Sequence, residues 1–183
     1  GERAVLVRAA LRGRAELLAD RIEEGAMLLA QFAGRLTDRE WKTPVTVGGN
    51  GRRTVGVIVH HVASVYPIEL DLARAIASGN AVTQVTWDLV NDLNARHAAE
   101  SAAVSKEETL DLLRKNTEQA AAAVRDFSDA ELDRAAPFSL SFGAPVTSQF
   151  VLEDHAVRHS WHHLARLRSS LGLVTENPFS QLD

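Results

Sequence analysis

Apolar residues recur at steps of three and four positions along much of the chain, a spacing that predicts amphipathic helices. Capping signals mark some of the helix ends. Ser105 and Glu108 form a capping box before one helix, Gly79 follows another, and Gly172 follows a third. The long helices are predicted at residues 2–36, 54–78, 105–127 and 151–171.

The segments between these helices carry signals of their own. Residues 37–40 read Thr-Asp-Arg-Glu, a second capping box that is expected to open a short turn carrying Trp41. Residues 82–98 are expected to form a shorter helical piece and residues 43–53 a loop. Residues 136–147 are expected to form an extended loop that could lie over a site.

Four long helices without a series of strands predict an all-α four-helix bundle. A length of 183 residues with 45% hydrophobic content suits a single domain, 1–183. Gly13, Gly25 and Gly34 are expected to weaken the first helix without ending it, because an isolated glycine costs about 1 kcal/mol against alanine. Pro67 is expected to kink the second helix.

Composition narrows the classes of partner. A net charge of -4 and a pI near 6.0 give no basic field, so binding to nucleic acid is not expected. Without cysteine, any metal must be held by nitrogen and oxygen atoms. No apolar run approaches the roughly 20 residues that cross a bilayer, and the arginine-rich start lacks the apolar core of a signal peptide. We therefore expect a cytoplasmic protein with no membrane partner.

Four of the seven histidines lie in the stretch 151–171. At about 100° per residue, His155, His159 and His163 follow one face at i, i+4 and i+8, with His162 close beside them. Phe150, Val157, Trp161, Leu164, Leu167 and Leu171 are expected to form a separate packing face. The histidine row is open to two interpretations: a solvated surface, or half of a metal site formed by two histidines one turn apart.

The second helix carries another histidine pair. The helical wheel places apolar residues on both sides of His61, so its side chain is expected to point inward, either as a hydrogen-bonded core histidine or as a ligand. His60 turns about 100° away and is the weaker candidate. His97 follows Leu93 by one turn in the shorter helical piece, which makes it a candidate for contact with the same interior.

Facing helices of a bundle can bring such rings together. One histidine from the second helix and an i, i+4 pair from the fourth would give three imidazoles, and these leave the fourth position of a tetrahedral metal open, as in catalytic sites. The spacing alone allows either His155 with His159 or His159 with His163.

Two motifs resemble the DinB-like superfamily of DNA-damage-inducible proteins. Residues 54–63 read TVGVIVHHVA and residues 159–163 read HSWHH, and weaker similarity covers 36–41 and 127–132. The resemblance implies a bundle with a long crossover between helices two and three. It also implies a divalent metal held by His61, His159 and His163. Family members often continue the last histidine with Arg-Gly-Gln, whereas Leu-Ala-Arg follows here.

The resemblance implies a metal-dependent enzyme, such as a transferase or isomerase that uses a low-molecular-weight thiol of the mycothiol or bacillithiol type on a small-molecule substrate. The alternatives are a hydrolase that uses metal-bound hydroxide and a non-catalytic binding module related to stress. Zn is the leading expectation for the metal, with Ni or Fe as alternatives.

Other side chains are candidates for supporting roles. Glu153 and Asp154 could orient an imidazole. The remaining histidines could move protons close to the metal: His60, His97, His155 and His162. Apolar residues around much of the first helix also suggest a homodimer.

Overall fold

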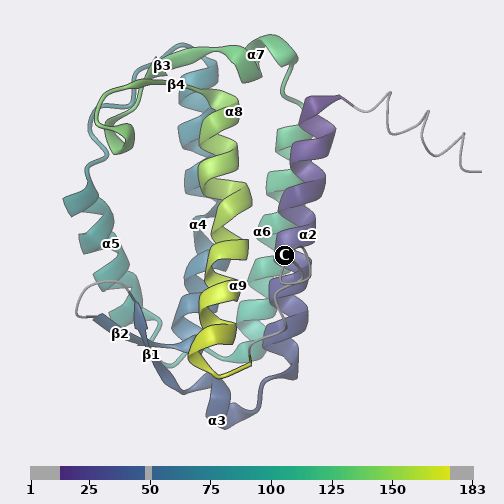
Figure 1. Cartoon of the computed structure of the whole chain (residues 1–183), viewed down its shortest axis with the longest axis vertical. Helices are drawn as coiled ribbons and strands as arrows, with labels where there is room; N and C mark the ends of the chain where they lie inside the picture. Colours follow the sequence, from purple (N-terminus) through teal and green to yellow (C-terminus); the bar gives the residue numbers. More distant parts are fainter. Residues whose placement is uncertain (1–12, 48–50, 174–183) are drawn as a thin grey trace, which may run out of the picture.

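Four long helical stretches form the body of the protein in the computed structural model, which describes residues 13–47 and 51–173 (Figure 1). The first three are α2 (Arg14–Arg35), α4 (Val55–Ala77) and α6 (Lys106–Arg125). The fourth is continuous and consists of α8 (Ser148–Val151), the π-helical η2 (Leu152–Val157) and α9 (Arg158–Ser170). The predicted all-α four-helix bundle is therefore confirmed.

The order of the helices in space differs from a simple up-and-down bundle. α6 packs along both α2 and α4, and α9 also contacts both α2 and α4. In Figure 1, α4 and α6 run upward while α2 and the α8–α9 stretch run downward. Because α4 and α6 are parallel, the chain between them must return along the bundle, and it does so through α5 (Trp87–Glu100). This connection is the long crossover that the family resemblance implied.

α2 begins later than predicted. Gly13 has extended backbone angles and occupies the N-cap, so it lies before the helix and not inside it. Residues 2–12 of the predicted helix lie outside the described residues. Gly25 and Gly34 are inside α2, as expected, and neither ends it.

The short helices follow their capping signals. Thr37 and Glu40 form a reciprocal capping box at the start of α3 (Asp38–Trp41), and Ser128 begins α7 (Asp129–Asp133) in the same way. The Ser105 side chain accepts a hydrogen bond from the backbone N–H of Glu108 at the start of α6. These ends were predictable because a cap depends only on residues three positions apart.

The predicted loop at 43–53 is wrong. β1 (Pro44–Val47) and β2 (Gly51–Thr54) pair as an antiparallel hairpin, and the residues of the turn, 48–50, lie outside the described part. The alternation Val-Thr-Val with a Gly-Gly-Asn-Gly turn is a hairpin signal, but each strand has only four residues and β2 carries two arginines. The hairpin base connects to α4 because Val55 N–H donates to the carbonyl of Thr43.

The extended loop predicted at 136–147 also contains paired strands. β3 (Ala135–Pro137) and β4 (Pro145–Thr147) are antiparallel and flank the 3-10 turn η1 (Ser139–Ser141). This segment lies at the end of the bundle opposite the β1–β2 hairpin (Figure 1). It therefore does not lie over the start of α4, where His61 is found.

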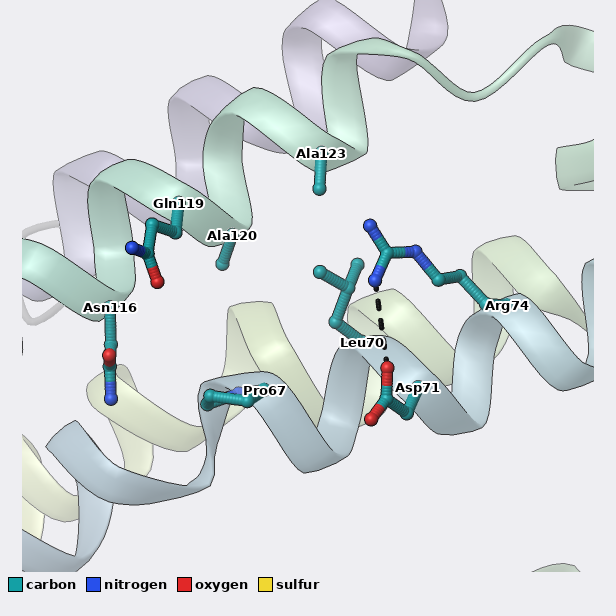
Figure 2. A pocket seen from close by; sticks show the side chains of 8 residues that line it. All are labelled: Pro67, Leu70, Asp71, Arg74, Asn116, Gln119, Ala120 and Ala123. Atoms are coloured by element: carbon teal, nitrogen blue, oxygen red, sulfur yellow. Dashed lines mark ion pairs between the residues drawn. The ribbon is translucent and has the colours of Figure 1, made fainter.

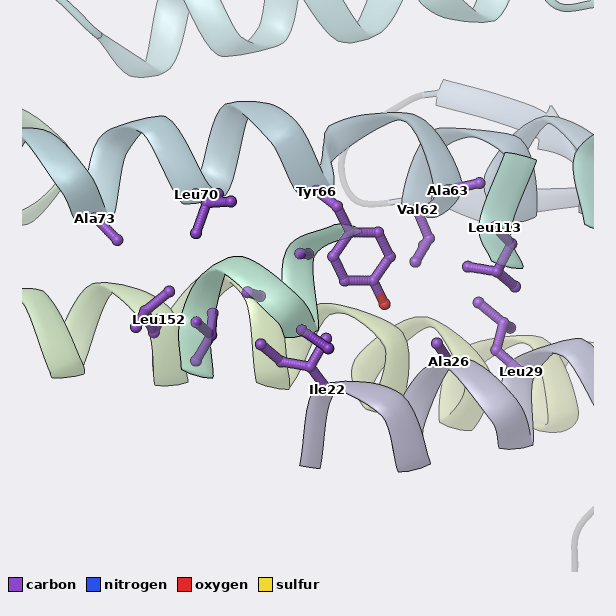
Figure 3. Close-up of a cluster of buried hydrophobic side chains, with 14 of the residues drawn as sticks. Ile22, Ala26, Leu29, Val62, Ala63, Tyr66, Leu70, Ala73, Leu113 and Leu152 are labelled. Carbon is purple, nitrogen blue, oxygen red and sulfur yellow. The ribbon is translucent and has the colours of Figure 1, made fainter. Parts of the chain in front are cut away.

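The core lies between the four helical stretches. Tyr66 of α4 is fully buried at its centre, and its hydroxyl shares a 2.5 Å hydrogen bond with Ser160 Oγ of α9. Burial raises the pKa of Tyr66 to about 12, so the phenol remains neutral. Figure 3 shows side chains of α2, α4, α6 and η2 around it, including Ile22, Ala26, Leu29, Val62, Leu70, Leu113 and Leu152.

The packing face predicted for the fourth helix is partly wrong. Phe150 and Trp161 are 42% and 39% exposed, whereas Val151, Leu152 and Ala156 are buried. For Phe150, which precedes the π-helical η2, the reason is that the wider turn changes the register between residues before and after it. A wheel drawn at a constant 100° per residue cannot anticipate this shift. Trp161 lies after η2, at the edge of the buried face of α9 that contains Ser160, Leu164 and Leu167.

Pro67 lies inside α4 without ending it. Proline has no N–H to donate to the carbonyl four residues earlier, here Ala63, and the Asn116 side chain of α6 donates to that oxygen instead at 2.8 Å. A cavity of about 180 Å³ adjoins this point (Figure 2). Its lining contains no histidine and consists of Pro67, Leu70, Asp71, Arg74, Asn116, Gln119, Ala120 and Ala123.

In the described part of the chain, α4 alone is long and apolar enough to cross a membrane by length and composition, with a mean hydropathy of 1.2 over its best window. The expectation concerned an unbroken apolar run, and α4 is not one, because it contains Glu69, Asp71 and Arg74. In addition, 61% of that window is buried inside the bundle, as in the core helix of a globular fold.

The crossover helix α5 differs from the others because it contributes no buried residue. It packs on α4, while Leu89 and Leu93, which were expected to line its inner side with His97, are more than 40% exposed. The homodimer stays a prediction. Leu17 and Met27 are exposed apolar side chains of α2 that a dimer interface would cover.

Candidate metal centre

His61 lies in the first half of α4 and points into the bundle, as the helical wheel predicted. It is 8% exposed. Burial is the main cause that lowers its pKa to about 3, and the neighbouring His159, His97, Arg53 and His60 lower it further. A neutral imidazole has a free nitrogen lone pair at neutral pH, which is the form that binds metals.

Two histidines of α9 face His61 from the other side of the core. The ring centroids of His61 lie 5.0 Å from His159 and 5.8 Å from His163, and those of His159 and His163 are 4.8 Å apart. One ligand nitrogen from each of the three rings lies within 4.8 Å of the other two. We call these three residues the histidine cluster.

Glu69 of α4 orients one ring of the cluster. Its Oε1 lies 2.7 Å from His159 Nδ1, and its side chain is buried. With a proton on Nδ1, His159 donates this hydrogen bond and keeps the Nε2 lone pair free. A carboxylate that holds a histidine in this manner is a common second layer of protein metal sites.

The chemistry of the histidine cluster fits a divalent metal ion. Burial lowers the pKa of His163 to about 2, so this imidazole is also neutral, and its buried Nδ1 has no hydrogen-bond partner among the residues that the structure describes. Three imidazole nitrogen donors suit Zn and the later first-row metals. Three ligands also leave room for a further ligand, as in catalytic sites.

A second histidine pair lies beside the cluster. His60 Nδ1 and His97 Nε2 are 2.8 Å apart, and their rings stack with centroids separated by 5.1 Å. The His97 ring is also 5.6 Å from that of His61. The predicted approach of His97 to the interior is correct, because the crossover helix brings it to the start of α4.

The other two histidines are not part of the cluster. His155 lies in η2 and packs edge-on against Phe138, with ring centroids 5.7 Å apart. His162 is exposed beside His163. Of the two pairs that the spacing allowed, the structure brings His159 and His163 to His61 and leaves His155 outside.

The prediction that Glu153 and Asp154 orient an imidazole of the metal site is wrong. Glu153 interacts with Gln149 and Arg21, and Asp154 pairs with Arg158, so neither holds a ring of the cluster. Glu69 was missed, although a carboxylate in an apolar helix two turns after His61 was a usable signal. Its partner is 90 residues away in the sequence, which no local pattern can reveal.

Comparison with known families settles the relationship. A family model described as the DinB superfamily matches residues 21–167. The chain belongs to the DinB superfamily. No curated protein matches the chain significantly. This DinB-superfamily chain is nevertheless similar in fold to several solved structures.

One of these is YfiT from Bacillus subtilis, described as a probable metal-dependent hydrolase with an unusual four-helix bundle topology. It is 22% identical with a TM-score of 0.66, over 87% of this chain and 88% of YfiT. Another is a mycothiol-dependent maleylpyruvate isomerase, 14% identical with a TM-score of 0.63, over 85% of this chain but only 61% of the isomerase. At these identities the likeness shows the fold alone.

A third similar structure is the colibactin self-resistance protein ClbS in complex with double-stranded DNA. It is 16% identical with a TM-score of 0.68, over 90% of this chain and 99% of ClbS. DNA binding by one DinB-fold protein means that the absence of nucleic acid among the partners of this chain stays a prediction.

Proposed function

We propose that His61, His159 and His163 bind a divalent metal ion, with Zn as the leading candidate, and that the protein is a metal-dependent enzyme that acts on a low-molecular-weight thiol of the mycothiol or bacillithiol type. The observation that carries this proposal is the convergence of three imidazole nitrogens within 4.8 Å of one another, with one of the rings held by a buried carboxylate. Membership of the DinB superfamily supports it.

A divalent ion with an open position acts as a Lewis acid that lowers the pKa of a bound thiol or water. The protein's own part is to hold the three rings in place. Glu69 fixes the tautomer of His159, and burial keeps His61 and His163 neutral over the physiological range. Both helices are anchored by the same core, so the ligand nitrogens are positioned before a substrate arrives.

The surroundings of the cluster suit a bound thiolate. The charged side chains that lower the pKa values of His61 and His163 are Arg53 and Arg166, both cations. A positive field stabilises a thiolate. A hydrolase also needs a general base close to the attacking water. Glu69 is already engaged with His159, so His60 and His97 would be the candidates for that role.

Metal binding is tested by elemental analysis of freshly purified protein. We expect about one divalent ion per chain. His61→Ala and His163→Ala should lose it, whereas His162→Ala, which changes the exposed neighbour of His163, should retain it. Purified protein without divalent metal at neutral pH, or equal metal content in all variants, would contradict the proposal.

The reaction class is tested on the metal-loaded protein with a panel of thiols that includes mycothiol, bacillithiol and glutathione. Thiol-dependent consumption of an electrophile such as monobromobimane, lost in His61→Ala, is the expected result. Turnover of simple esters or amides without thiol would instead support the hydrolase, which the described role of YfiT favours. Metal binding without turnover in either assay would support a non-catalytic module.

A further inference from the structure

Arg53 lies on the inner face of the β1–β2 hairpin. In the strand register it stands opposite Val45, and directly opposed residues of an antiparallel pair project to the same side. Val45 is buried in the core, so Arg53 is on the side that faces the bundle. Arg52, by contrast, stands opposite Thr46, and both are exposed.

The hairpin is held against the two helices that carry the histidine cluster. The base of β1 connects to the start of α4 through the hydrogen bond from Val55 to Thr43. The Arg166 guanidinium of α9 donates to the carbonyl of Thr46 in β1 at 3.3 Å. The position of Arg53 is therefore fixed relative to both α4 and α9.

The charge of Arg53 acts on the site. It contributes to lowering the pKa values of His61 and His97, so the guanidinium lies within electrostatic reach of both rings. The carboxylates that act on this histidine group from α5 and α6 are Glu100 and Glu108, which face His97 and His60. Neither forms an ion pair with Arg53.

The arginines that hold the fold together differ from Arg53 because they form ion pairs with carboxylates of the chain. Arg125 binds Glu16, Asp20 and Glu23 of α2, and Arg14 binds Asp129 and Asp133. Among the described residues, no side chain or carbonyl accepts a hydrogen bond from the Arg53 guanidinium. A half-buried arginine with no hydrogen-bond acceptor in the described part of the chain is placed to bind an anion that comes from outside the chain.

We propose that Arg53 binds a carboxylate of the small molecule that occupies the histidine site, so that the ligands of this enzyme are carboxylate-bearing. The planar guanidinium matches a carboxylate through two parallel hydrogen bonds, which a lysine or a water molecule does not reproduce. This inference rests on the proposed function, because it requires the other end of the ligand to reach a metal held by the histidine cluster.

The test uses full-length protein loaded with Co²⁺, in which thiolate binding gives a charge-transfer absorption band. 3-Mercaptopropionate, which carries a carboxylate, is compared with its neutral amide. We expect the acid to bind roughly tenfold more tightly than the amide, as for a charge-assisted bidentate pair. Arg53→Gln should remove this preference, and Arg53→Lys should restore only part of it.

Arg52→Gln is the matched control, because it removes the same charge from the outer face of the same strand. It should keep the preference for the acid. If Arg53→Gln does not fold, the wild-type protein still provides a test: the preference should decrease as salt concentration rises, since an ion pair is screened, while binding of the amide stays constant.

The outcomes separate the two proposals. A wild-type protein that binds Co²⁺ and both thiols with equal affinity would overturn the role of Arg53 and leave the metal site intact. Equal loss of preference in Arg52→Gln and Arg53→Gln would also overturn it, because the effect would then reflect net charge alone. A protein that binds no Co²⁺ would overturn the metal site and, with it, this inference.

Discussion

At the scale of single residues, the site depends on how burial changes the chemistry of ordinary side chains. His61 and His163 are neutral because the core excludes water, and His159 is oriented because Glu69 is buried beside it. Within residues 13–47 and 51–173, Glu69 Oε2 has no hydrogen-bond partner, so the carboxylate is not optimised for the stability of the protein without metal. Its placement is accounted for by its effect on His159.

Glu69→Gln is therefore expected to weaken metal binding while the protein stays folded. The amide keeps the volume but accepts a weaker hydrogen bond, and changes of this kind at an orienting residue typically lower metal affinity about 10- to 100-fold. The measurement is a competition titration with a chromophoric chelator. Asp71→Asn, on the exposed side of the same helix, is the control, and equal affinities in both variants would contradict the role of Glu69.

The three histidines of the site could be predicted from the sequence, but the residues that surround and orient them could not. The wheel around His61 was reliable because the whole of α4 keeps a regular helical period. The choice of His159 with His163 over His155 needed the family resemblance, because spacing was equal for both pairs. Glu69 and the approach of Arg53 depend on contacts between distant segments, which have no signature in a local pattern.

At the scale of elements, the start of α4 is positioned by the close packing of Trp41 against the backbone at Gly56. A Cβ built on Gly56 would lie 2.5 Å from Trp41 Nε1, so the absence of a side chain allows α3 to pack directly on α4. The same indole nitrogen donates to the carbonyl of Val104, which precedes α6. Gly56 therefore brings three elements together one turn before His60 and His61.

Gly56→Ala is expected to lower the free energy of unfolding by about 1–3 kcal/mol, because Trp41 must move and lose its packing. Gly34→Ala is the matched control. A Cβ there meets nothing within 4 Å, so the alanine should be neutral or stabilise α2 by up to about 1 kcal/mol. Urea denaturation of both variants tests this, and equal effects would contradict the close-packing account.

The helices were predictable and the strands were not, for a physical reason. An amphipathic helix repeats its pattern over many turns, as in α6, whereas β1 to β4 have three or four residues each, too few to establish a period. The register shift in η2 likewise comes from a single wide turn. Short elements are specified by their packing, so they are visible only when the fold is known.

At the scale of the whole molecule, the metal site would connect the second and fourth helical stretches. A metal that binds only the folded chain adds to its stability by mass action. Chelation is expected to lower the melting temperature by roughly 5–10 °C at a metal excess of about 100-fold over the dissociation constant. Differential scanning fluorimetry before and after chelation measures this, and adding Zn²⁺ back should reverse it. An unchanged melting curve would contradict a bridging metal.

The metal-free fold should lose stability in mild acid. His61 and His163 have pKa values far below the usual 6.5, so the unfolded chain binds protons that the folded chain does not. Stability is therefore complete above pH 6.5 and decreases below it, by up to about 1.4 kcal/mol per pH unit for each histidine.

This decrease is measured by urea denaturation of chelated protein between pH 6.5 and about 5, where most carboxylates remain ionised. His61→Leu should make the slope shallower because it removes one of the two histidines whose pKa is lowered most, while the four histidines with smaller shifts, His60, His97, His155 and His162, still contribute. A stability that does not change over this interval would show that the two rings are protonated in the fold as readily as in the unfolded chain.

The weak attachment of α5 affects how a small molecule can reach the histidine cluster. It contributes no buried residue, yet His97 near its end lies against His60 and His61. Detaching it costs little of the free energy that holds the bundle, so its amide protons should exchange with solvent well before those of α4. Each such detachment uncovers one side of the histidines, which gives a small molecule a way in and out while the four main helical stretches stay folded.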